Sequence, residues 1–151
     1  MKKWIWLAAL ALLLLPQRGT EVGKLLPVET LLIEKQAGQY RVSADTGNAG
    51  WGDSLEKAVD ALRAEAPGIL FLDTADYVLL AEEAEDCMEK LPDYVRPGTR
   101  VYELEGTVEL SEIGSFLKTH GPDAPLYRLQ KRELQLPKLM AEGEKMHFEG
   151  Q

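Results

Sequence analysis

Two carboxylates on one predicted strand have the spacing best suited to catalysis. Glu103 and Glu105 lie two positions apart in the predicted strand 99–105, so their side chains share a face about 6.6 Å apart. Carboxylates near this separation can serve as acid and base in glycoside hydrolysis. Acids on one face of a strand are more typical of a solvated sheet edge, where they discourage pairing with another chain. We favour the sheet edge and keep a small exported hydrolase using Glu103 and Glu105 as the third hypothesis.

A glycine-rich segment, residues 47–52, is the second candidate for chemistry. Its spacing is G-x-x-G-x-G rather than G-x-G-x-x-G, and no P-loop Lys-Ser/Thr pair follows it. The strand before it belongs to a predicted hairpin, so no dinucleotide-binding βαβ unit forms here. We therefore interpret the segment as a flexible loop. Trp51 in this loop is a candidate contact for a protein partner, with packing over the start of the next helix as the alternative.

Metal and nucleophile chemistry find little support. One predicted helix carries a cluster of acidic residues: Glu82, Glu83, Glu85, Asp86 and Glu89. No loop of alternating Asp or Asn ligands accompanies this cluster, so we favour a solvated helix face over a cation site. His120 and His147 have no Ser or Cys elbow nearby. Cys87 is the only cysteine and is predicted to be a small buried hydrophobe, with a reactive thiol as the alternative. We expect no catalytic, cofactor or metal site.

Residues 1–18 are predicted to be a signal peptide or an N-terminal membrane anchor. Lys2 and Lys3 precede an apolar run from Trp4 to Leu15, which is the pattern of an export signal. As a helix this run would reach about 18 Å, whereas a bilayer core is about 30 Å thick, so a signal-peptide core is favoured over a permanent span. Small residues in an A-x-A-like arrangement are missing, so cleavage stays open. We expect the protein at the outer face of the cytoplasmic membrane, or secreted if the leader is cut.

The charge of the exported part limits its partners. Two of the 17 basic residues, Lys2 and Lys3, precede residue 16, so the chain beyond residue 15 has 15 basic and 25 acidic residues and a formal charge of −10. Such an acidic body repels phosphate backbones, so no nucleic acid partner is expected. Its length suits one domain with its own core.

Alternating strand and helix patterns predict a mixed α/β fold. The initial hairpin turns at residues 36–38, which makes the sheet mixed rather than fully parallel, and about three helices pack on it in the order ββαβαβα. We expect this domain over residues 19–129, followed by a C-terminal extension, 130–151, with a loose strand that lacks a partner. The predicted strands are residues 28–34, 39–44, 69–72, 77–80 and 99–105. The predicted helices begin at Asp53 or Ser54, where Asp53 and Glu56 approximate a capping box, and near residues 81 and 110.

Several short segments occur in an order that points to one family. They are LLIEK at 31–35, GQYRV at 38–42, GDSLEKAV at 52–59, DYVLLAEEA at 76–84, LPKL at 136–139 and FEG at 148–150. This order resembles the N-terminal domain of the Ger(x)C family of spore germination lipoproteins, with patterns such as IGIDK…DGKYRV, G-x-S/T-L-x-E-A and LP-x-L…LEG. The family's lipobox cysteine is missing near residues 16–19, and its later domains are not in the sequence.

The resemblance implies the C subunit of a nutrient germinant receptor, without enzymatic activity, on the outer face of the inner spore membrane. Membrane-embedded receptor subunits would be its partners. Our leading hypothesis is therefore a non-enzymatic exported component that acts in spore germination through protein–protein contacts. The alternative is a secreted or membrane-tethered ligand-binding module unrelated to germination.

Overall fold

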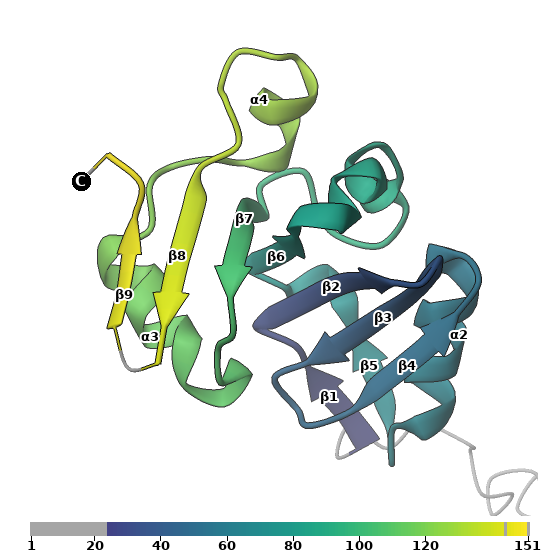
Figure 1. Ribbon diagram of the computed structural model, residues 1–151. Coiled ribbons are helices and arrows are strands. Elements are labelled where there is room, and N and C mark those ends of the chain that lie inside the picture. The colour runs from purple at the N-terminus through teal and green to yellow at the C-terminus, as the bar shows by residue number, and fades with distance from the viewer. Residues whose placement is uncertain (1–23, 144, 151) are drawn as a thin grey trace, which may run out of the picture.

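A seven-stranded sheet organises the computed structural model, which describes residues 24–143 and 145–150 (Figure 1). Its strand order is β4-β3-β2-β6-β7-β8-β9, and β1 pairs with β5 in a separate small sheet. The elements in chain order are β1 (Leu25–Pro27), β2 (Thr30–Gln36), β3 (Gln39–Ala44), β4 (Ala49–Gly52), α2 (Leu55–Glu65), β5 (Ile69–Phe71), η2 (Leu72–Thr74), β6 (Tyr77–Ala81), η3 (Glu82–Asp93), β7 (Arg100–Gly106), α3 (Leu110–His120), α4 (Leu126–Gln130), β8 (Lys138–Glu142) and β9 (Lys145–Phe148).

Four parallel strands, β2, β6, β7 and β8, form the centre of the large sheet, and antiparallel strands flank them on both sides. The predicted mixed α/β sheet that begins with a hairpin is confirmed. The hairpin turns at Ala37 and Gly38, whose φ angles are 49° and 79°. Two residues with positive φ make the turn whose twist matches that of the paired strands.

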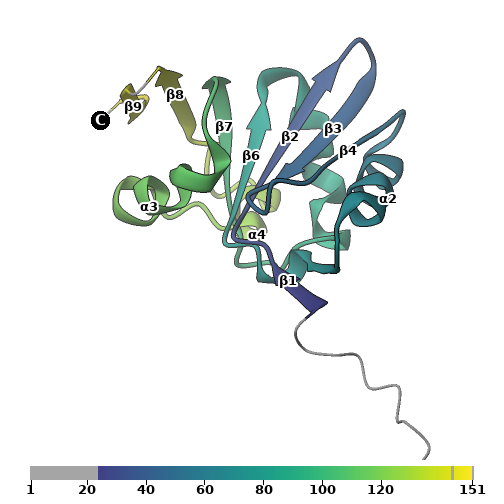
Figure 2. The same ribbon diagram turned by 90° about the horizontal axis from the view of Figure 1, so that it is seen from below.

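Helical segments cover both faces of the central strands. Val78, Leu79 and Leu80 on β6 are fully buried, although neighbouring residues of a strand point to opposite faces. Helix α2 and the 3-10 helix η3 pack on the face that carries Leu31 and Ile33, while α3 packs on the other. Helices α2 and α3 lie at opposite ends of the sheet (Figure 2).

The glycine-rich segment is a strand rather than the flexible loop predicted for it. Residues 49–52 form β4, which pairs antiparallel with β3 at the edge of the sheet. A Cβ atom on Gly50 would lie 2.1 Å from the backbone nitrogen of Leu62, and one on Gly52 would lie 2.5 Å from that of Ala58. These two glycines therefore let α2 approach the strand more closely than any side chain permits.

The C-terminal extension joins the sheet, which corrects the expectation of a loose strand. Strand β8 pairs parallel with β7, and β9 pairs antiparallel with β8. Leu139, Ala141 and Phe148 belong to the buried core. The expected boundary between residues 129 and 130 falls at the end of α4, a short helix that the sequence pattern did not reveal.

Three further differences concern local structure. The predicted helix near residue 81 is the 3-10 helix η3, whose three-residue turn matches the spacing of the buried Ala84 and Cys87. The strand predicted at 69–72 pairs with β1, which was not predicted. Helix α2 is capped by Ser54, whose Oγ accepts a hydrogen bond from the Lys57 backbone at 3.3 Å. Asp53, predicted with Glu56 as a capping box, instead pairs with the Lys57 ammonium at 2.8 Å.

Candidate functional site

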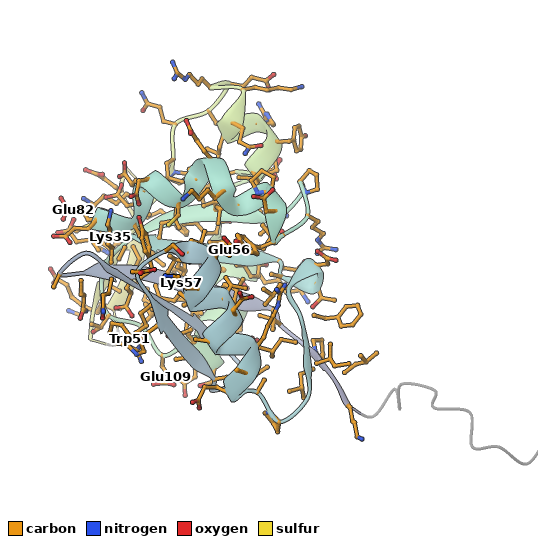
Figure 3. All side chains as sticks on the ribbon, turned by 90° about the vertical axis from the view of Figure 1, so that its right-hand side faces the viewer. Lys35, Trp51, Glu56, Lys57, Glu82 and Glu109 are labelled. Atoms are coloured by element: carbon orange, nitrogen blue, oxygen red, sulfur yellow. The ribbon has the colours of Figure 1, made fainter. Side chains whose placement is uncertain are left out.

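Trp51 lies in a row of three side chains on an open face of the sheet. The strand register aligns Glu34, Arg41 and Trp51 on β2, β3 and β4. An Arg41 Nη1 atom lies 3.2 Å from Glu34 Oε2, and the guanidinium carbon lies 5.5 Å from the centre of the Trp51 ring. The Trp51 side chain stands apart from α2, which carries Glu56 and Lys57 (Figure 3). We name these three residues the Trp51 row.

The local sequence explains why Trp51 faces outward. Side chains alternate along a strand, so a residue between Gly50 and Gly52 must point away from the helix that those glycines contact. Trp51 keeps 48% of its surface exposed as a result. The alternative prediction, that Trp51 packs over the start of the next helix, does not hold. A period-two glycine pattern around an aromatic residue was the sequence signal for this arrangement.

A groove adjoins the Trp51 row where the sheet meets the start of α3. It has a volume of about 270 Å³ and is bounded by β3, by the β3–β4 turn and by residues 108–111. Arg41 and Ser43 form part of its floor. Among the described residues, Arg41 Nε and Ser43 Oγ are buried without a hydrogen-bond partner. Buried polar atoms are normally paired, so this groove offers unused donors beside the row.

Strand β4 also presents an open edge. It is the last strand of the large sheet and pairs only with β3 in the described part of the chain. The outward N–H and C=O groups of such a strand can pair with an extended segment of another protein. The open edge, the Trp51 row and the groove are thus contiguous features of the β3–β4 hairpin.

A second polar cluster joins the β2–β3 hairpin to η3. Asp86 Oδ2 lies 2.6 Å from Lys35 Nζ and accepts a hydrogen bond from the Tyr40 hydroxyl at 2.7 Å. The hydrogen bond with Lys35 holds the pKa of Asp86 below its usual value, and the bond with Asp86 raises the pKa of Lys35. Lys35 extends toward the side of η3 where Glu82 lies (Figure 3). Asp86 thus has structural partners, and the cluster connects the β2–β3 hairpin to η3.

The two carboxylates on β7 are placed together, but not at a sheet edge. Strand β7 is a central strand between β6 and β8, so the solvated-edge interpretation is wrong. Lys138 Nζ on β8 lies 3.5 Å from Glu103 and 2.6 Å from Glu105. The hydrogen bond with Glu105, and then the charge of Glu103, raise the pKa of Lys138. The two glutamates thus form ion pairs with Lys138 that connect β7 to β8. This arrangement gives the hydrolase hypothesis no support.

The remaining candidate residues are dispersed. Cys87 is buried, as predicted, and burial raises the pKa of its thiol to about 12. His120 ends α3 and stacks on Phe116, whereas His147 lies on β9. No group of three or more His, Cys, Asp or Glu side chains in the described residues is arranged to hold a metal ion.

The leader residues Lys2, Lys3, Trp4 and Leu15 lie outside the described residues. Within residues 24–143 and 145–150, no helix is long and apolar enough to cross a membrane.

Comparison with known proteins adds no relative: no protein-family model, no curated protein and no solved structure matches this chain.

Proposed function

We propose that the protein is a non-enzymatic, exported component of a spore germination assembly and binds a partner protein through the β3–β4 hairpin. The single observation that carries the contact site is Trp51, an aromatic residue half exposed on an open sheet face and adjoined by Arg41 at 5.5 Å. Tryptophan and arginine are the residue types enriched at the energetic centres of protein interfaces. The partner would be a membrane-embedded receptor subunit, and the protein would act at the outer face of the cytoplasmic membrane.

The hairpin offers two complementary means of attachment. A partner strand added to the edge of β4 would gain main-chain hydrogen bonds, and a side chain from it would lie against the exposed ring of Trp51. The buried Arg41 Nε and Ser43 Oγ could donate to carbonyl or carboxylate oxygens of the partner after a small shift. An extended segment with acceptor groups is therefore the partner chemistry that we propose.

The assignment to germination is supported by the sequence resemblance and by the predicted export. Two of the resembling segments coincide with junctions between elements: residues 52–59 span the end of β4 and the start of α2, and residues 76–84 span β6 and the start of η3. Segments at such junctions carry cap and turn residues that define a chain path. The apolar leader is predicted to direct the chain to a membrane, and we call this predicted targeting the membrane address.

Deletion and complementation in the spore-forming host test the proposal. We expect deletion of the gene to slow nutrient-triggered germination and the wild-type gene to restore it. Trp51→Ala should fail to restore germination although the protein is folded and present, because the contact loses its aromatic centre. Tyr127→Ala is the matched control, since Tyr127 is 46% exposed on α4 and this helix lies far from the β3–β4 hairpin (Figure 1). This variant should restore germination fully.

Two outcomes would contradict the proposal in different ways. Normal germination of the deletion strain would remove the germination role and favour a secreted or tethered ligand-binding module. Full restoration by Trp51→Ala would keep that role and move the contact away from the hairpin. Cross-linking of the wild-type protein to receptor subunits, lost in Trp51→Ala alone, would identify the partner directly.

A further inference from the structure

The small sheet of β1 and β5 has an apolar outer face. Its parallel register places Leu25 beside Ile69 and Pro27 beside Phe71, while the intervening pair, Leu26 and Leu70, points to the core. Ile69 is 49% exposed and Phe71 is 42% exposed. We name Leu25, Pro27, Ile69 and Phe71 the strand-pair face.

This alternation differs from that of an ordinary surface strand. A strand with one face in the core normally carries polar side chains on the other face. Here both faces are apolar, and no described element covers the outer one well enough to bury Ile69 or Phe71. Contiguous exposed apolar side chains of this kind mark interaction sites.

The position of the face in the chain indicates what it contacts. The apolar leader run ends at Leu15, and β1 begins at Leu25, directly after Lys24. The nine Cα steps from Leu15 to Lys24 span at most about 32 Å even when fully extended. If the leader inserts in a membrane, β1 therefore begins within about 32 Å of the lipid surface, with β5 paired beside it.

We propose that the strand-pair face rests in the interfacial layer of the membrane to which the leader directs the chain. The proposal rests on the membrane address that forms part of the proposed function. Exposed aliphatic and aromatic side chains bury themselves between the headgroups and the acyl chains of a bilayer. The chain has a net charge of −8, so we expect apolar burial rather than attraction to anionic lipids, and the contact should form on neutral phosphatidylcholine.

Depth-dependent fluorescence quenching on the full-length protein tests the proposal. Phe71→Cys and, separately, Ile69→Cys are labelled with an environment-sensitive maleimide dye and reconstituted in phosphatidylcholine vesicles that contain a nitroxide quencher near the headgroups. The native Cys87 is 2% exposed and its thiol pKa is raised to about 12, so it should stay unlabelled. Tyr127→Cys is the control because α4 lies at the opposite end of the molecule from β1 (Figure 1).

We expect several-fold stronger quenching at position 69 or 71 than at position 127, with little dependence on salt. Equal quenching at the three positions would overturn the proposal while leaving the membrane address intact. A blue shift at position 71 that needs no lipid and grows with protein concentration would also overturn it, because a second copy of the chain would then cover the face. Failure of the full chain to associate with vesicles would contradict the membrane address itself, whereas the germination assay is independent of all these outcomes.

Discussion

The two ends of the large sheet are stabilised by opposite means. At the β3–β4 end, α2 approaches Gly50 and Gly52, which have no side chains to hold it away. At the β8–β9 end, α3 packs through aromatic rings: Phe116 stacks on Phe148 at 6.2 Å, and Phe148 meets Tyr102 edge to face at 5.0 Å. Backbone contact thus closes one end of the sheet, and large side chains fill the other.

This difference explains where the protein can bind. At the α3 end the large side chains are used inward, and Phe148 is only 2% exposed. At the α2 end the inward positions need no side chain, and the large residue of β4, Trp51, faces outward. A strand that contacts a helix through glycine is therefore suited to present an aromatic side chain on its opposite face. Variants that remove a buried ring, add a methyl group between strand and helix, or change a helix cap test this contrast.

Phe148→Ala should have the largest effect. Removal of a buried ring at the β8–β9 end leaves a cavity beside Tyr102 and Phe116, and we expect the free energy of unfolding to fall by about 3–4 kcal/mol. Urea unfolding followed by circular dichroism measures this loss. Tyr127→Ala, at an exposed aromatic residue, should change stability by less than about 0.5 kcal/mol. Equal losses in the two variants would mean that β9 is not docked in solution.

Gly50→Ala tests the backbone contact at the other end. The added Cβ would lie 2.1 Å from Leu62 N and 2.2 Å from Ala58 O, both backbone atoms. We expect a loss of about 2–3 kcal/mol, because the helix must move away from the strand. Gly98→Ala is the matched control, since a methyl group added there would meet no atom within 4 Å and the φ angle of Gly98 lies outside the left-handed region. An unchanged free energy of unfolding in Gly50→Ala would show that α2 does not approach β4 so closely.

The helix starts provide a smaller contrast. Ser54 caps α2, whereas Glu109 at the same position of α3 makes no side-chain cap bond. Ser54→Ala should lower stability by about 1 kcal/mol, and Glu109→Ser should raise it by up to about 1 kcal/mol. Thermal unfolding midpoints of both variants measure the two shifts. Shifts of the same sign would contradict the assignment of the caps.

Asp86→Asn should have the smallest effect, and one that depends on pH. The folded pKa of Asp86 is held below its unfolded value of about 3.9 by the hydrogen bond from Lys35, so the stabilisation is present above that value and is lost as the pH falls through the folded pKa. We expect the wild-type protein to exceed the variant slightly in unfolding midpoint between about pH 6 and pH 8, and the difference to shrink as the pH falls below about 3.9. The exposed Glu85→Gln serves as control; a difference that persists in acid would have another cause.

Much of the fold could be predicted where the signal was local. The hairpin turn at Ala37 and Gly38, the helix that begins after Ser54 and the buried Cys87 each follow from a few neighbouring residues. Trp51 was chosen as a contact candidate for its type and its glycine neighbours, but from the wrong local structure. Glu103 and Glu105 were placed correctly on one strand, yet their central position and their partner Lys138 could not be predicted.

The sequence by itself therefore determined the hairpin turn at Ala37 and Gly38, the start of the helix near Ser54, the acidic character of the chain and the apolar leader. Only the tertiary structure decided that residues 49–52 are a strand, that β1 pairs with β5, and that β8 and β9 join the sheet beside β7. The physical reason is the range of the interactions. Turns and helix starts are stabilised within a few residues, whereas pairing between distant strands depends on which surfaces the whole chain can bury together.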